Sequence, residues 1–291
     1  MTDLLVKNCL LSKNKDPQDI LIKDGVIRDI ASKITADNIP IIDADFHFVT
    51  PPFVDSHFHM DATLSYGLPR VNKSGTLLEG IKLWGELKPN LTADAIKERA
   101  LKFCKWAIAR GTLAIRSHVD ISGQNLVGVE ALLDVRETMK DFIDIQLVAF
   151  PQDGLLRSNC LDNLNAALDM GVDVVGGIPH FERTMEEGHE SIRILCEIAE
   201  KRGLLTDLHC DETDDPMSRH VEKLALETTR LGLKGRVAGS HLTSMHSIDN
   251  YYFTKLISLL VEADLNIIAN PLINITIQGR QDNYPKRRGL T

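Results

Sequence analysis

Two histidines separated by one residue, His57 and His59, close an apolar run that begins at Phe53. On a β-strand, residues i and i+2 point to the same face, so both imidazoles can approach one point. Neutral imidazole nitrogens are common ligands of divalent metal ions. The pair is therefore a candidate half of a metal site, although a His-x-His pair by itself is frequent by chance.

Two further histidines, His209 and His241, each end a later apolar run that has the length of a strand. If these runs are parallel strands of one barrel, their carboxyl ends meet at the face where the active sites of such barrels gather. His57, His59, His209 and His241 are therefore predicted to lie together and to form a metal site.

The other histidines are interpreted differently. His118 also lies near a strand end, and we expect a supporting or structural role for it. His180 follows the predicted strand at residues 172–178, and we expect it either to line the mouth of the pocket or to pack in the core. The remaining four are expected in loops or on helices, without a role in the site: His47, His189, His220 and His246.

The carboxylates beside His209 leave a choice open. Strict alternation along a strand would put Asp211 on the face of His209 and would point Glu212 the other way. If the strand has already ended, the longer side chain of Glu212 suits a proton shuttle that stands off a metal. By the same alternation Cys210 faces away from His209, so we expect it to be buried packing.

The elements that must position these residues fall into two regions. Residues 1–50 show short apolar runs joined by turns, and Lys23-Asp24-Gly25 predicts a hairpin because Gly accepts positive φ. This region is predicted to be a small β subdomain, half of a β-sandwich. Residues 51–291 are predicted to form the domain that carries the site.

In this larger region, strand-like runs alternate with amphipathic helices, of which 92–110 and 190–202 are the clearest. The predicted strands are 53–59, 113–119, 143–150, 172–178, 204–210, 236–241 and 266–270. Repeated strand–helix units indicate a parallel sheet, and no glycine-rich phosphate loop follows the first strand. The sequence therefore predicts the α/β class and a (β/α)8 barrel in which strand eight is absent.

The composition excludes several classes of protein. The chain of 291 residues is 43% hydrophobic and 25% charged, with a net charge of −8 and no basic stripe, so nucleic-acid binding is not expected. The short cluster Lys286-Arg287-Arg288 is interpreted as a solvated charge run. Five scattered cysteines without a Cys-x-x-Cys pair are typical of reduced thiols, and no apolar run has membrane length. We expect a soluble cytoplasmic protein that does not bind membranes.

The chain resembles the amidohydrolase superfamily, and more closely the bacterial-type cytosine deaminases, which carry one iron or zinc ion in a (β/α)8 barrel. The likeness runs nearly from end to end. The segments that carry it are Pro51-Pro52-Phe53-Val54, Phe150-Pro151-Gln152-Asp153-Gly154, Ile178-Pro179-His180-Phe181-Glu182, His209-Cys210-Asp211-Glu212, residues 240–247, residues 270–274 and residues 284–289.

The resemblance implies a role for each matching residue. It implies that His57, His59 and His209 bind one Fe(II) or Zn(II) ion. Gln152 would hydrogen-bond the ring edge of the substrate. Glu212 would be the proton shuttle, which resolves the choice left open above, and His241 would orient the attacking water. The implied reaction is hydrolysis of cytosine to uracil and ammonia in pyrimidine salvage, and the resemblance also implies a homo-oligomer.

One departure from the family pattern concerns the last metal ligand, an aspartate at the end of strand eight. The sequence reaches Thr291 before such a strand, and neither Asp264 nor Asp282 is expected at a strand end that could replace it, so we expect a truncated chain. Two alternatives remain open. One is a deaminase of a related aminopyrimidine, aminotriazine or oxidised purine on the same scaffold. The other is a noncatalytic fragment or pseudoenzyme.

Overall fold

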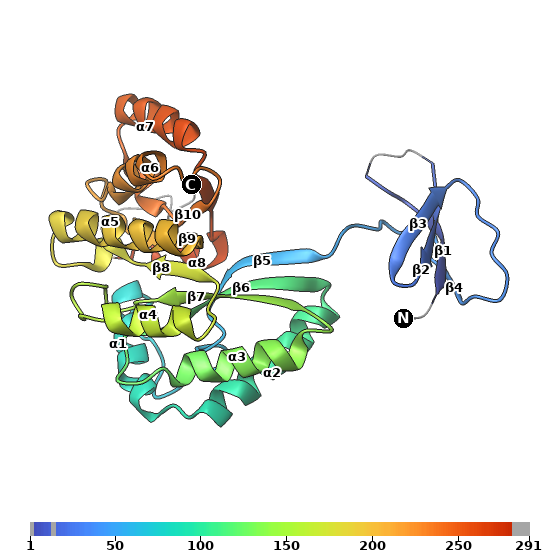
Figure 1. The fold of residues 1–291 in the computed structure, drawn as a ribbon, viewed down its shortest axis with the longest axis horizontal. Helices are drawn as coiled ribbons and strands as arrows, with labels where there is room; N and C mark the ends of the chain where they lie inside the picture. The colour runs from blue at the N-terminus through green and yellow to red at the C-terminus, as the bar shows by residue number, and fades with distance from the viewer. Residues whose placement is uncertain (1–2, 13–15, 281–291) are drawn as a thin grey trace. The chain divides into compact units, whose positions relative to one another are not determined.

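The computed structural model describes residues 3–12 and 16–280, which form two compact units, Met1–Phe53 and Val54–Thr291 (Figure 1). Asp282, the basic cluster at 286–288 and the segment at 284–289 lie outside the described residues. Each unit is described by itself below.

The smaller unit is a four-stranded sheet in the order β3-β2-β1-β4. Its strands are β1 (Leu4–Cys9), β2 (Gln18–Lys23), β3 (Val26–Ala31) and β4 (Ile41–Asp43). The hairpin between β2 and β3 turns at Asp24 and Gly25, whose φ angles are 55° and 74°. Two consecutive positive φ angles are what the tight two-residue hairpin turn requires, and this part of the sequence analysis is confirmed. That the sheet is half of a β-sandwich stays a prediction.

The larger unit contains a seven-stranded sheet in which each strand lies beside its neighbour in sequence. Its strands are β5 (Phe53–Phe58), β6 (Thr112–Asp120), β7 (Asp144–Phe150), β8 (Val174–Gly177), β9 (Leu205–Cys210), β10 (Val237–His241) and β11 (Asn266–Ile268). The pairs from β6 to β11 are parallel. The sheet curls into a nearly closed barrel, so that side chains of β5 and β10 meet inside it. The predicted fold is confirmed, with seven strands among the described residues.

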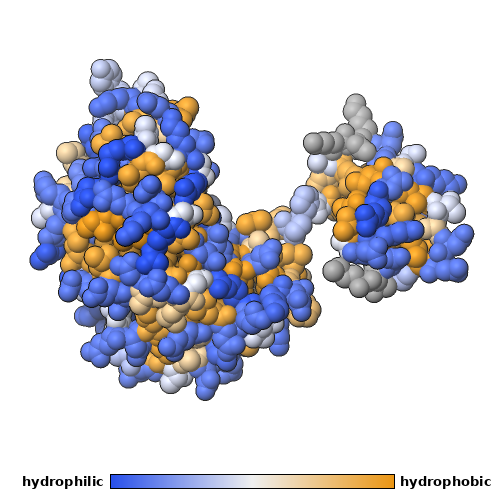
Figure 2. Space-filling view, viewed as in Figure 1, coloured by the Kyte–Doolittle hydropathy of each residue, from blue (hydrophilic) through white to orange (hydrophobic). Residues whose placement is uncertain are grey.

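Helices cover the outer face of this sheet (Figure 1). They are α2 (Ala93–Ala109), α3 (Val127–Met139), α4 (Leu161–Asp169), α5 (Met185–Arg202), α6 (His220–Arg230) and α7 (Asn250–Ala263). Two further helices, α1 (Leu77–Leu87) and α8 (Pro271–Ile277), lie beside the carboxyl ends of the strands. Short 3-10 turns are η1 (Lys88–Asn90), η2 (Pro179–Phe181) and η3 (Thr243–Ser247). The buried residues of α2, α3, α5 and α6 pack with the strands into one apolar core. Figure 2 shows hydrophilic residues over much of the viewed face of this unit, with apolar residues between them.

The two helices singled out in the sequence differ in how well their bounds were predicted. The start of α2 is confirmed, because the side chain of Thr92 caps it by accepting from Ala95 N. The predicted start of α5 at residue 190 is wrong, because the helix begins at Met185, where Thr184 accepts from Glu187 N. No helix of the described residues is both long and apolar enough to cross a membrane.

Candidate metal and active site

Four histidines from three strand ends meet inside the barrel. His57 lies on β5 and His59 follows it, while His209 and His241 lie near the ends of β9 and β10. The ring centroid of His57 is 4.5 Å from that of His209 and 4.7 Å from that of His241, and the rings of His59 and His209 are 5.1 Å apart. Residues 150 and 184 positions apart in sequence thus share one small volume.

The ring nitrogens approach one another in pairs. Nε2 of His59 lies 3.1 Å from Nε2 of His209, and Nε2 of His57 lies 3.2 Å from Nε2 of His241. Two nitrogens that bind one tetrahedral ion at 2.0–2.1 Å are about 3.3 Å apart. The observed separations therefore suit nitrogens that converge on a cation.

The protonation state of the rings also suits a metal. Burial, followed by the neighbouring imidazoles, lowers the pKa values of His57, His59 and His209 well below the ordinary value. Burial lowers the pKa of His241 to about 3. The four rings are neutral at pH 7, so each has a nitrogen lone pair to offer, and the residues present fit a divalent ion.

His118 lies closer to this cluster than the sequence analysis expected. It is fully buried, and its ring centroid is 4.3 Å from that of His57. Two sets of three ring nitrogens lie within 4.8 Å of one another, namely His57, His209 and His241, and His57, His59 and His118. The ligand set of His57, His59 and His209 stays a prediction, and His118 is an alternative ligand.

A buried carboxylate, Asp207, lies beside the histidines and was not singled out in the sequence. Its Oδ2 accepts from the Arg116 guanidinium at 2.9 Å, and its Oδ1 accepts from Ser240 Oγ at 2.7 Å. Ser240 Oγ in turn lies 3.0 Å from Nδ1 of His57. Alternation could have indicated two of these residues, because Asp207 is two positions before His209 and Arg116 is two before His118.

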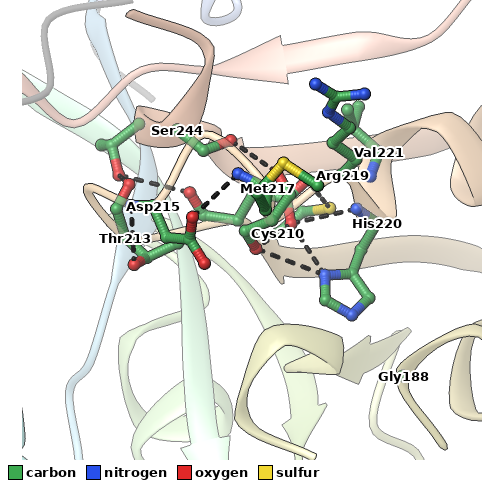
Figure 3. A network of polar contacts seen from close by, with 12 residues as sticks. Gly188, Cys210, Thr213, Asp215, Met217, Arg219, His220, Val221 and Ser244 are labelled. Carbon is green, nitrogen blue, oxygen red and sulfur yellow. Dashed lines mark hydrogen bonds and ion pairs between the residues drawn. The ribbon is translucent and has the colours of Figure 1, made fainter. Parts of the chain in front are cut away.

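The structure separates the roles of the two carboxylates that follow β9. The backbone turns at Asp211, whose φ of 50° is left-handed, so alternation no longer holds there. The Asp211 carboxylate accepts from Ser218 Oγ at 2.6 Å, from Nδ1 of His220 at 2.8 Å and from Val221 N at 2.9 Å, at the start of α6 (Figure 3). Burial opposes ionisation of Asp211, but the bonds from His220 and Ser218 hold its pKa at about 2. Asp211 is an ionised anchor for the helix.

Glu212, in contrast, faces the histidines. Its Oε1 lies 3.2 Å from Nδ1 of His241, and its side chain is 5% exposed. Burial raises the pKa of Glu212 to about 8, so the carboxyl group holds a proton at neutral pH. A buried acid of this kind is suited to give and take protons near pH 7.

Gln152 lies in the loop that follows β7, and that loop is held at several points. One oxygen of Glu182 accepts from the backbone amides of Leu155 and Leu156 at 2.7 and 3.1 Å, and its other oxygen accepts from Arg157 N at 2.9 Å. On the other side of the loop, Lys88 Nζ donates to Asp153 at 2.5 Å. The loop therefore has a fixed backbone on which Gln152, a half-buried residue, can be presented to a ligand.

A cleft of about 640 Å³ opens beside Glu212. His180, which the sequence analysis placed either at the pocket mouth or in the core, lines this cleft, and burial lowers the pKa of His180 to about 4. Apolar side chains of α1, Leu77 and Ile81, also line it. The cleft is large enough for a single-ring or double-ring heterocycle.

Comparison with known proteins decides the family. Residues 40–291 match the Amidohydrolase family. The chain belongs to that family. The resemblance noted in the sequence is thereby confirmed, and membership, together with the histidine cluster, supports a metal-dependent hydrolytic enzyme.

Solved structures similar to this amidohydrolase include 5-methylcytosine deaminase from Klebsiella pneumoniae. With phosphonocytosine bound, that structure matches at a TM-score of 0.94 and 40% identity over 99% of this chain and 71% of that one. With 5-fluorocytosine bound, it matches at a TM-score of 0.95 and 42% identity over 99% of this chain and 70% of that one. The backbone path of the amidohydrolase is thus similar to that of 5-methylcytosine deaminase over nearly its whole length.

Curated relatives are more varied in what their names state. N-isopropylammelide isopropyl amidohydrolase of Pseudomonas sp. is 31% identical over 91% of this chain and 67% of that protein. Pterin deaminase of Rhizobium rhizogenes is 29% identical over 94% of this chain and 63% of that protein. The amidohydrolase thus spans about two thirds of the length of these relatives.

Proposed function

We propose that this chain forms the metal-binding barrel of a hydrolytic deaminase whose substrate is cytosine or a 5-substituted cytosine. The observation that carries the proposal is the 40–42% identity, over 99% of the chain, to structures of 5-methylcytosine deaminase with cytosine analogues bound. In the reaction, water adds to the ring carbon that bears the amino group and ammonia leaves, so that cytosine and water become uracil and ammonia.

In this proposal the metal is held by His57, His59 and His209, and it is Fe(II) or Zn(II), both of which suit imidazole ligands. When bound, such an ion lowers the pKa of water and so supplies a nucleophile at neutral pH. The remaining chemistry belongs to the side chains around the ion.

Glu212 moves protons in the proposed reaction. Burial raises the pKa of Glu212 to about 8 in the metal-free chain, and in its acid form Glu212 can protonate the ring nitrogen next to the reacting carbon. It can then take up the two protons of the added water in turn, passing the first to the leaving amine and keeping the second, which restores its acid form. His241, whose Nδ1 faces Glu212, is neutral and orients the water. Gln152 hydrogen-bonds the polar edge of the ring.

The experiment that tests the substrate class is ammonia release from a panel of bases by the zinc-loaded and iron-loaded protein. We expect turnover of cytosine and 5-methylcytosine at least tenfold above that of N-isopropylammelide and pterin. The reverse order would contradict the proposal. The variant Glu212→Gln serves as the inactive control for contaminating deaminases.

A second candidate is removal of an amino or alkylamino group from N-isopropylammelide or pterin. It is favoured by the identities of 31% and 29% to the two curated relatives. The third possibility is that the chain is a noncatalytic fragment. Metal binding without turnover of any base would support it. Three further points stay predictions: that the protein is cytoplasmic, that it acts in pyrimidine salvage and that it forms a homo-oligomer.

A further inference from the structure

Asp207 is a charged side chain with no exposed surface, and both of its oxygens accept hydrogen bonds inside the barrel, one from Arg116 and the other from Ser240. We propose that Asp207, acting through the hydroxyl of Ser240, fixes the tautomer of His57 and thereby sets the affinity of the site for its metal. Asp207 and Ser240 are positioning residues in this proposal, which rests on the metal site of the proposed function.

The direction of each hydrogen bond follows from the number of protons available. The carboxylate of Asp207 is paired with the Arg116 guanidinium at 2.9 Å, and an ionised carboxylate can only accept. Ser240 has a single hydroxyl proton, which it donates to Asp207 Oδ1 at 2.7 Å. Its oxygen is therefore left as an acceptor for the His57 ring.

The His57 tautomer is then determined. Nδ1 of His57 lies 3.0 Å from Ser240 Oγ and must carry the ring proton in order to donate to it. A neutral imidazole carries only one N–H, so Nε2 of His57 is left with a free lone pair. This is the nitrogen that points toward the other histidines, and a metal ligand must be unprotonated.

The hydrogen bonds of His241, on the other side of His57 from Ser240, agree with this assignment. Nε2 of His241 lies 3.2 Å from the bare Nε2 of His57, so in the metal-free site His241 donates from Nε2 and its Nδ1 is an acceptor. The side-chain amide of Asn274, a buried residue of α8, donates to that Nδ1 at 3.1 Å. The opposite tautomer of His57 would leave Ser240 Oγ facing a bare nitrogen with no proton between them.

A purely structural role is the alternative explanation for Asp207. The ion pair with Arg116 joins β9 to β6 and could stabilise the barrel without influence on the metal. Removal of the Ser240 hydroxyl separates the two explanations, because it cuts the connection to His57 and leaves the ion pair intact. Loss of such an outer hydrogen bond typically costs 10–100-fold in metal affinity.

The test compares wild-type protein with Ser240→Ala, after removal of metal by a chelator. Zinc affinity is measured by competition with a chromophoric chelator, and the histidine tautomers are read from nitrogen-15 NMR of the metal-free protein. We expect His57 to carry its proton on Nδ1 in the wild type, and zinc affinity to fall by about 10–100-fold in Ser240→Ala.

Two further variants control for stability. Ser191→Ala removes another buried hydroxyl, one that donates to Gly188 O within α5, and it should leave zinc affinity unchanged. Ser240→Thr keeps a hydroxyl at the position and should retain most of the affinity. Unfolding curves of all variants show whether each is folded at the assay temperature, and the tautomer measurement on the wild type needs no variant.

Zinc affinity of Ser240→Ala equal to that of the wild type would overturn the proposal, as would a wild-type His57 protonated on Nε2. Wild-type protein that binds no zinc would overturn both this proposal and the proposed metal site. Wild-type protein that binds zinc but releases no ammonia from any base would contradict the proposed function alone, because affinity and tautomer are measured without turnover.

Discussion

Oε1 of Glu212 lies 3.2 Å from Nδ1 of His241, and both side chains are almost completely buried. The pair joins the loop after β9 to the end of β10 beside the histidine cluster. Because burial gives Glu212 a pKa of about 8 and His241 a pKa of about 3, both are neutral at pH 7. A neutral acid next to a neutral base, close to a metal site, is an arrangement for proton transfer.

Glu212→Gln should abolish turnover without loss of metal. The amide keeps the volume of the side chain but cannot shuttle a proton, so we expect ammonia release to fall by about 10²-fold or more. Bound zinc or iron, measured on the same samples, should stay at the wild-type level. Glu262→Gln, on the exposed side of α7, is the matched control and should retain wild-type turnover. Wild-type activity in Glu212→Gln would exclude the shuttle role.

The buried acid also predicts how stability depends on pH. The pKa of Glu212 is about 8 in the folded chain and about 4.3 in the unfolded chain, so between these values the folded state binds the extra proton. Stability contributed by this group is complete below about pH 4 and is lost as the pH rises toward 8. The difference is on the order of a few kcal/mol for a buried acid.

Chemical unfolding of the metal-free protein at a series of pH values measures this dependence. Comparison with Glu212→Gln isolates it, because the variant lacks this carboxyl group and keeps every other titratable group of the chain. The wild type should lose stability relative to the variant between about pH 5 and pH 8. If the free energies of unfolding of the two proteins depended on pH in the same way, Glu212 would not be a buried, protonated carboxyl group.

The hydrogen bonds that Glu182 accepts from the loop carrying Gln152 predict an effect on substrate binding. Glu182→Gln removes the charge that accepts three backbone amides of the Gln152 loop, so the loop should become less ordered. We expect KM for cytosine to rise about tenfold, with a smaller change in kcat and no change in metal content. Glu186→Gln, an exposed neighbour in the first turn of α5, should leave KM unchanged. An equal KM in both variants would contradict the positioning of Gln152 by this loop.

A pair of glycine variants tests the packing of Gly188 against His220, the histidine that donates to Asp211. A Cβ atom at Gly188 would lie 2.3 Å from Nε2 of His220 and 2.6 Å from Pro179 O, so Gly188→Ala must displace the histidine that holds Asp211 (Figure 3). We expect a loss of about 1–3 kcal/mol in the free energy of unfolding, together with lower turnover. At Gly85 in α1 a Cβ meets nothing within 4 Å. Gly85→Ala should therefore stabilise the helix slightly, and a similar loss in both variants would contradict this account.

The sequence was sufficient for most of the barrel because its strands are short, continuous apolar runs that end in polar residues. All seven predicted strands are present, and the histidines at their ends converge as expected. The start of α5 was missed because Gly188 and His189 look like a break in the helix pattern. In the structure Gly188 is retained within the helix, where it makes room for the His220 ring.

Within the site, alternation was reliable only inside regular strands. It failed at Asp211, where a left-handed backbone redirects the following residues. The connection from Asp207 through Ser240 to His57 joins residues of three strands, β9, β10 and β5, and no local pattern encodes it. Such contacts depend on the curl of the sheet, which brings β5 opposite β10.

The most direct test of the central claim is ammonia release from cytosine and 5-methylcytosine by the purified chain, loaded with Fe(II) or Zn(II), with bound metal quantified in the same samples. The account predicts about one equivalent of metal per chain and turnover that disappears on chelation and returns when metal is restored. Metal-independent turnover, or a fully loaded chain that releases ammonia from neither base, would contradict it.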